Sequence, residues 1–147
     1  MQMERVARLI GRSLALRHVD CGSCNACESE LAMLFSPDYD AQHSGIDVIA
    51  SPRHADGVIV TGPGTTQMAA ALARTREAVG EPCLVVALGD CAVSGHVHEG
   101  GYAVGGRSWL TPDLAIPGCP PSPEEILQAL RRLMREGIPE QRAASGG

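Results

Sequence analysis

The chain has 147 residues, of which 44% are hydrophobic and 20% charged, a composition typical of a folded domain and not of a disordered segment. Its formal net charge is −5 and its aromatic residues are one Phe, two Tyr and one Trp, which excludes a basic, base-stacking surface for nucleic acids. The longest apolar run, residues 83–88, is far too short to cross a bilayer as a helix, which needs roughly 20 residues.

The first half of the chain predicts three strands and one helix. Residues 14–19 form a first strand that leads into a cysteine-rich loop, and a helix follows over residues 25–35 and ends before Pro37. Residues 46–50 alternate between apolar and polar side chains, which predicts a second strand. Residues 57–61 are more continuously apolar and predict a third, more deeply buried strand.

The second half continues the alternation of helices and strands. Residues 66–79 have apolar side chains at helical spacing and predict a second helix. Residues 84–88 predict a fourth, buried strand, and the glycine-rich segment 95–106, which shows no periodicity, predicts a surface loop. Residues 114–116 predict a short fifth strand.

A third helix is expected to begin just after Ser122. Ser122 is a good N-cap, Pro123 suits the first helical position, and Glu125 completes a capping box. The buried face of this helix is expected to consist of Ile126, Leu127, Leu130 and Leu133.

Strands that alternate with helices predict an α/β fold with a mostly parallel sheet, and we expect the flavodoxin-like, doubly wound order. One domain is expected over residues 14–136, with a lead segment over 1–13 and a C-terminal tail over 137–147. In such sheets ligands bind beyond the carboxyl ends of the strands, so the loops at that edge are the place to seek a site.

Six cysteines require an explanation in a chain whose first residues predict no secretion signal, because disulfides are rare in the cytosol. Cys21, Cys24 and Cys27 follow the first predicted strand. Cys91 and Cys119 each lie three residues past the fourth and fifth strands. A parallel sheet brings these loops to one edge, so four thiolates can converge there.

Four thiolates can hold an iron–sulfur cluster or a zinc ion. Structural zinc favours paired Cys-x2-Cys knuckles, whereas here two of the ligands arrive singly from separate loops, which a wider cluster tolerates. Glycines close before the cysteines let the backbone approach cluster sulfurs, and Pro120 follows Cys119 as in other cluster motifs. The pattern therefore favours an iron–sulfur cluster.

Several separated motifs resemble one family. Residues 24–28 (CNACE), 89–92 (GDCA) and 117–124 (PGCPPSPE) are similar to the small subunit of energy-converting, group 4-type [NiFe] hydrogenases, which is itself similar to the 20 kDa, B-type subunit of respiratory complex I. Residues 50–56 (ASPRHAD) and 61–63 (TGP) also match that pattern. Complex I subunits usually carry adjacent cysteines at the first motif, so the Cys-x2-Cys spacing here favours the hydrogenase side.

The resemblance implies a ligand set and a role. It implies that Cys24, Cys27, Cys91 and Cys119 bind the irons of one [4Fe-4S] cluster. The chain would then be an electron-transfer subunit next to the catalytic large subunit of a membrane-associated [NiFe]-hydrogenase-like complex. Two alternatives are a B-type subunit of a complex-I-like NADH/quinone oxidoreductase and a stand-alone iron–sulfur redox sensor.

The resemblance also implies partners and a location. The partners would be the catalytic large subunit, a ferredoxin-like iron–sulfur subunit and integral membrane subunits, with a large apolar interface on this chain. The chain would be cytoplasmic, held peripherally on the cytoplasmic face of the inner membrane through those partner subunits, with no span of its own and no nucleic-acid partner.

Glu28 directly follows Cys27, at a position where the family carries an acidic residue, so the resemblance implies a catalytic role in proton transfer. The alternative is a carboxylate that the dipole of the first helical turn stabilises. Arg53 and His54 could supply positive charge to an anionic cluster or lie on the surface.

Three further side chains are weaker candidates. Cys21 is a rival ligand because Cys21 and Cys24 also form a Cys-x2-Cys pair, and it is otherwise a small buried thiol. Cys83 precedes a strand at the far end from the other cysteines, which predicts a packing role. His96 and His98 could bind a metal, but two histidines alone are a weak signal, and a solvated loop is expected.

Overall fold

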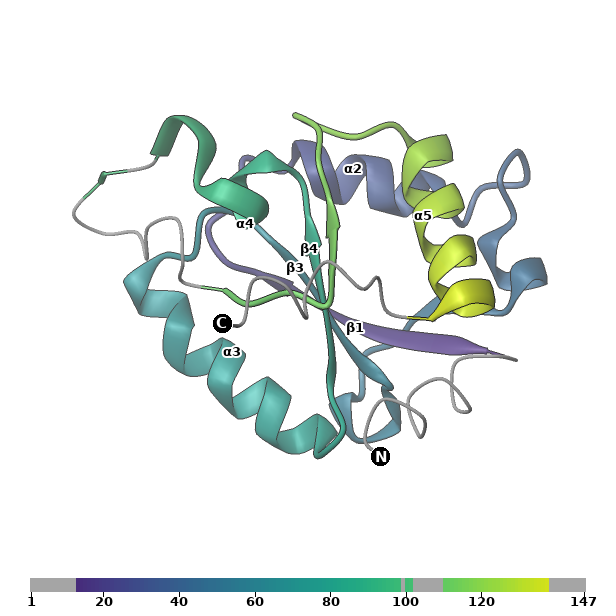
Figure 1. The fold of residues 1–147 in the computed structure, drawn as a ribbon, viewed down its shortest axis with the longest axis horizontal. Helices are drawn as coiled ribbons and strands as arrows, with labels where there is room; N and C mark the ends of the chain where they lie inside the picture. The colour runs from purple at the N-terminus through teal and green to yellow at the C-terminus, as the bar shows by residue number, and fades with distance from the viewer. Residues whose placement is uncertain (1–12, 99, 102–109, 138–147) are drawn as a thin grey trace.

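A five-stranded parallel sheet forms the centre of the structure (Figure 1). The computed structural model describes residues 13–98, 100–101 and 110–137. The strands are Leu14–Asp20 (β1), Ile46–Val48 (β2), Gly57–Thr61 (β3), Leu84–Leu88 (β4) and Leu114–Ile116 (β5). Their order is β2-β1-β3-β4-β5 with every pairing parallel, which confirms the predicted flavodoxin-like α/β fold.

Helices cover both faces of the sheet. The α-helices are Ala26–Met33 (α2), Thr66–Val79 (α3), Asp90–Ser94 (α4) and Pro123–Glu136 (α5), and the short 3-10 helices are Ala41–Ser44 (η1), Pro52–His54 (η2) and His96–His98 (η3). Helices α2 and α5 pack on one face, and α3 and α4 pack on the other (Figure 1).

The central strands divide their side chains between these two layers because successive residues of a strand point to opposite faces. On β3, Ile59 packs on the side of α2 and α5, whereas Val58 and Val60 pack on the side of α3. On β4, Val86 and Val85 divide in the same way. Every residue of β3 and β4 is buried, which explains why these segments are apolar apart from Thr61.

Helix α5 begins as the sequence predicts. The Glu125 N–H donates to the Ser122 hydroxyl (3.2 Å), and the Ser122 N–H donates to the Glu125 carboxylate (3.3 Å), which forms the capping box. Ile126, Leu130 and Leu133 are fully buried, while Leu127 is partly buried. Burial of each such aliphatic side chain contributes roughly 1.5–3 kcal/mol, so this face holds α5 on the sheet.

The structure corrects several predicted boundaries. The first strand is longer than predicted by one residue, the second ends at Val48, and the first helix covers Ala26–Met33 rather than residues 25–35. The segment after the fourth strand contains α4 and η3. Of these, η3 lies within residues 95–106, which the sequence predicts as a surface loop. Helices this short have no repeat of apolar side chains from which a sequence pattern could reveal them.

The predicted lead segment over 1–13 and tail over 137–147 lie almost wholly outside the described residues, as does part of the predicted loop, 102–109. Those domain limits therefore stay predictions. Among the helices that the structure describes, none has the length and apolarity that a membrane crossing requires.

Candidate functional site

Three cysteine-bearing segments leave the carboxyl ends of strands in the sheet. Cys24 and Cys27 follow β1, Cys91 lies in the first turn of α4 after β4, and Cys119 follows β5. Because all of these strands are parallel, and β1 is separated from β4 only by β3, the three segments meet at one edge of the sheet. The convergence that the sequence predicts is therefore present in the fold.

Two of these segments are joined directly by hydrogen bonds. The Gly118 N–H donates to the Asp90 carboxylate (2.8 Å), and the Asp90 N–H donates to the Gly118 carbonyl (2.9 Å). Asp90 precedes Cys91 and Gly118 precedes Cys119, so this pair of bonds holds the two single cysteines beside each other.

The first cysteine segment is held by a polar turn. The Asp20 carboxylate accepts hydrogen bonds from the N–H groups of Gly22 (3.0 Å) and Ser23 (2.8 Å). Gly22 has φ +94°, and a Cβ there would lie 2.4 Å from the Thr65 side chain. Glycine is required because it allows both the left-handed backbone and the close approach to the start of α3.

The four predicted ligands are close enough to influence one another's ionisation. Cys27 is buried, Cys91 is half-buried, and Cys24 and Cys119 are exposed. Burial, together with the charges of Glu28 and the other three thiols, raises the pKa of Cys27 to about 12. Burial also raises the pKa of Cys91, with Cys119 and Cys24 adding to the effect. Such thiols lose their protons when cationic metal compensates the negative charge.

The residues present fit an iron–sulfur cluster. Four cysteine thiolates are the donor set that such clusters use. In the described part of the chain, no group of three or more His, Cys, Asp or Glu side chains is placed to hold a metal ion. A four-iron cluster is wider than one ion and takes ligands that lie further apart. A Cβ on Gly89 would lie 2.5 Å from the Cys27 sulfur, so the glycine leaves room at this position.

Comparison with known proteins supplies the family. The profile of the family described as NADH ubiquinone oxidoreductase, 20 Kd subunit, matches residues 24–133, which include all four of these cysteines. The chain belongs to this family.

Members of the 20 kDa subunit family with different roles resemble this chain to a similar degree. A probable membrane-bound hydrogenase subunit of Pyrococcus furiosus is 37% identical over 131 residues, which cover 88% of this chain and 78% of that protein. A subunit of the NADH-quinone oxidoreductase of Carboxydothermus hydrogenoformans, of the B type, is 40% identical over 113 residues, which cover 75% of this chain and 68% of that protein.

The fold is also found in a solved respiratory complex. One chain in the structure of an archaeal membrane-bound sulfane sulfur reductase superposes on this chain with a TM-score of 0.74 and 26% sequence identity. The superposition covers 88% of this chain and 72% of that chain.

In this member of the 20 kDa subunit family, Cys21 is separated from the four predicted ligands. It is completely buried among the side chains that pack toward α3, including Val19 and Val60, whereas Cys27 packs on the opposite face with α5. Burial, with a smaller effect of the Asp20 charge, raises the pKa of Cys21 to about 11. Cys21 therefore has the environment of a packed core thiol.

Cys83 directly precedes β4, at the amino edge of the sheet and away from the four predicted ligands. It is half-buried against the α3 layer and close to Arg76. Burial raises its pKa. This position agrees with the packing role that the sequence predicts.

Glu28 is part of a polar network that no pattern in the sequence indicates. Its carboxylate accepts hydrogen bonds from the hydroxyls of Ser23 (2.7 Å) and Thr61, and His18 Nε2 lies 3.6 Å from one of its oxygens. Because the single hydroxyl hydrogen of Thr61 goes to Glu28, His18 Nε2 must donate to Thr61 across their 2.9 Å contact. Burial lowers the pKa of His18, although Glu28 opposes this effect.

The network opens into a cavity of about 430 Å³ between α2 and the β2 side of the sheet. Leu31, Phe35 and Val48 contribute apolar walls. The polar lining residues are His18, Glu28, Gln42 and Asp47. One feature of the sequence places the His18 side chain on this side of the sheet. His18 is an even number of residues from Leu14 and Leu16 on the same strand, so all three side chains face α2.

The remaining candidates lie apart from the four cysteines. Arg53 and His54 are exposed in η2, which precedes β3 at the amino edge, so their charge does not lie beside the cysteines. His96 and His98 are exposed in η3, and they belong to no group of metal-binding side chains in the described part of the chain.

The described residues leave few large apolar side chains exposed. Met33, on α2, is 47% exposed and is the sole large apolar side chain of the described residues with such exposure.

Proposed function

We propose that this chain holds one [4Fe-4S] cluster through Cys24, Cys27, Cys91 and Cys119. When bound, the cluster accepts and donates single electrons. The observation that carries the proposal is the convergence at one sheet edge of thiols from three separate segments, each close enough to shift the ionisation of others.

The chain's own residues determine how such a group would be held. Cys27 reaches it from the buried side, while Cys24 and Cys119 lie at the exposed side, where a partner subunit can approach. The two hydrogen bonds between Asp90 and Gly118 keep the other two ligand segments in register. Burial and hydrogen bonds to sulfur are the means by which this protein would set the reduction potential.

As a subunit, the chain would pass electrons between a catalytic large subunit and a ferredoxin-like subunit of a membrane-associated [NiFe]-hydrogenase-like complex. The Cys-x2-Cys spacing of Cys24 and Cys27 and the 37% identity to a probable membrane-bound hydrogenase subunit support this choice. It would lie on the cytoplasmic face of the inner membrane, attached through integral membrane subunits.

A second candidate is a B-type subunit of a complex-I-like NADH/quinone oxidoreductase. The 40% identity to a subunit of an NADH-quinone oxidoreductase favours it. Hydrogen-dependent reduction of a viologen dye by the purified complex separates the two, since we expect it from a hydrogenase and not from a quinone reductase.

The cluster is tested in the complex purified without oxygen. We expect Cys91→Ser and Cys119→Ser to remove the EPR signal of one reduced cluster, because each removes one thiolate of four, and to lower iron and sulfide by about four atoms each per complex. Cys83→Ser is the matched control and should keep the signal. Loss of the signal in Cys83→Ser together with its retention in Cys91→Ser would contradict the ligand assignment.

A further inference from the structure

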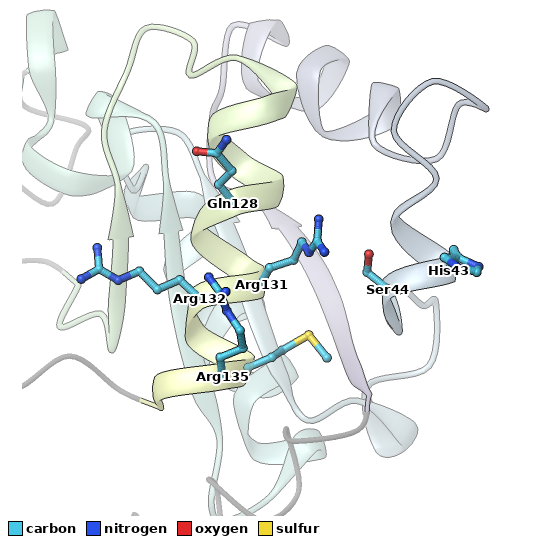
Figure 2. Close-up of a pocket in the computed structure, with 7 residues that line it drawn as sticks. His43, Ser44, Gln128, Arg131, Arg132 and Arg135 are labelled. Atoms are coloured by element: carbon cyan, nitrogen blue, oxygen red, sulfur yellow. The ribbon is translucent and has the colours of Figure 1, made fainter.

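A basic hollow lies at the edge of the sheet opposite the cysteines. It has a volume of about 720 Å³ and lies between η1, which precedes β2, and the C-terminal half of α5 (Figure 2). Its polar lining residues are His43, Ser44, Gln128, Arg131, Arg132 and Arg135. We call the surface that these side chains form the basic hollow.

Two of the arginines have no anionic partner among the described residues. Arg132 pairs with Glu136 (2.9 Å) and extends to the far side of α5 in Figure 2. Within the part of the chain that the structure describes, Arg131 and Arg135 form no ion pair or hydrogen bond. They are four positions apart on one helix face, an arrangement in which like charges repel each other.

This unpaired charge stands out because the whole chain carries a net charge of −5. None of the described residues that line the hollow is acidic, so an anionic group of another molecule would supply the counter-charge that these neighbours lack. Guanidinium groups match carboxylates with two parallel hydrogen bonds, and the hydroxyl of Ser44 supplies a further donor. The Gln128 amide already donates one hydrogen to Glu124 (3.3 Å) and has a second to offer.

The shape of the site favours a protein over a lipid surface. A bilayer surface is nearly flat and touches the rim of a hollow, whereas a protruding loop or helix end can enter it. We propose that the basic hollow docks an acidic, protruding segment of a neighbouring subunit. The inference rests on the proposed function only in requiring that this chain works inside a multi-subunit complex.

The sharpest test places an amine at the two positions. In the assembled complex, Arg131→Lys and Arg135→Lys keep the positive charge and allow a carbodiimide to join the new side chain to a carboxylate in direct contact. We expect cross-links from both positions to Asp or Glu residues of one neighbouring subunit, identified by mass spectrometry. Arg74→Lys, at an exposed position of α3, is the matched control and should give none.

Charge reversal gives a second readout. The double variant Arg131→Glu/Arg135→Glu should raise the dissociation constant of the chain for its partner subunits by about fivefold or more, because exposed ion pairs contribute modestly and reversal adds repulsion. Arg74→Glu should change it by less than about twofold. A complex that forms normally and yields no cross-link from either position would overturn the inference.

Two other outcomes are distinguishable. Binding of the chain to vesicles of phosphatidylcholine with phosphatidylglycerol, lost on charge reversal and without protein cross-links, would overturn the inference in favour of a membrane contact. Failure of the unmodified chain to purify with any subunit would overturn the proposed function, and the inference with it.

Discussion

Cys21 and Cys27 are only six positions apart, yet their sulfurs lie in different layers of the protein. Cys21 follows β1 directly and has the same parity as Val19, so its side chain packs toward α3. Cys27 lies in the first turn of α2 on the opposite face, beside Leu31. Burial makes both thiols poor acids, with pKa values raised to about 11 and about 12, but only Cys27 shares its surroundings with the other three predicted ligands.

Alkylation of the isolated chain tests this difference. Because the thiolate is the reactive form, Cys24 and Cys119, which are exposed, should react with iodoacetamide at pH 8 once iron is removed by a chelator, and should be protected while iron is bound. Cys21 should remain unmodified in both states, because it is buried and its pKa is raised to about 11. Peptide mass spectrometry measures each site.

The half-buried Cys83 serves as the internal control, because its modification should not depend on iron. A pattern in which Cys21 gains reactivity on iron removal in step with Cys24 would instead assign Cys21 to the ligand set.

Glu28 can be tested as a proton carrier. Its carboxylate accepts from Ser23 and Thr61 and faces His18, so it is held at the same edge as the cysteines without a full counter-charge. Glu28→Gln preserves the shape and one acceptor but cannot exchange a carboxyl proton. We expect normal assembly and an unchanged EPR signal with turnover of the complex at least tenfold slower, if proton transfer contributes as general acid–base groups usually do.

Glu30→Gln, on the same helix, is the control and should turn over normally. Normal turnover of Glu28→Gln would leave Glu28 as a structural carboxylate of the first turn of α2, with proton transfer confined to the partner subunit.

At the scale of elements, the β4–α4 turn positions two parts of the site at once. Gly89 has φ +89°, and a Cβ there would lie 2.5 Å from the Cys27 sulfur. The next residue, Asp90, bonds to Gly118 and so sets the spacing between α4 and the segment after β5. This turn therefore joins the first ligand segment to the other two.

Gly89→Ala should abolish cluster binding, measured by iron content and EPR. The added methyl group meets the Cys27 sulfur as well as straining the backbone. Gly80→Ala is a close control, because Gly80 has φ +83° and nothing within 4 Å of a built Cβ. It should cost about 1–3 kcal/mol of stability, because its φ of +83° with ψ −176° is a conformation that favours glycine, and it should retain the cluster. Equal iron loss in both variants would show that the strain alone, and not the contact with Cys27, is responsible.

At the scale of the whole molecule, the described surface has two contrasting edges. The carboxyl edge carries the exposed Cys24 and Cys119, and the amino edge carries the basic hollow. Apart from Met33, the described residues expose little large apolar surface. The large apolar interface expected from the sequence stays a prediction.

Membrane attachment should accordingly depend on partners. In cells that make the whole complex, the chain should sediment with the membranes. In cells that lack the membrane subunits, it should move to the soluble fraction, because no described helix is fit to cross a bilayer. Fractionation followed by immunoblotting measures the distribution. Retention on membranes in the absence of the membrane subunits would contradict a purely indirect attachment.

The sequence alone determined the elements whose apolar residues recur at a regular spacing. The five strands, the long helices α3 and α5, and the α5 capping box follow from local patterns of two or 3.6 residues, and the parallel α/β order follows from their alternation. The same reasoning placed Cys91 and Cys119 at one edge, since a residue just past a parallel strand can lie nowhere else.

Only the tertiary structure decided the contacts between distant side chains. Thr61 forms hydrogen bonds with Glu28, 33 positions away in the sequence, and with His18, 43 positions away. These contacts exist because β1 and β3 are neighbours and the side chains of His18 and Thr61 both face α2. Arg53 and His54 proved to lie at the opposite edge from the cysteines, and η1 meets α5 at the basic hollow. A local pattern determines on which face of a strand or helix a side chain lies. Strand order and helix packing determine which residues that face contacts, and they depend on the whole core at once.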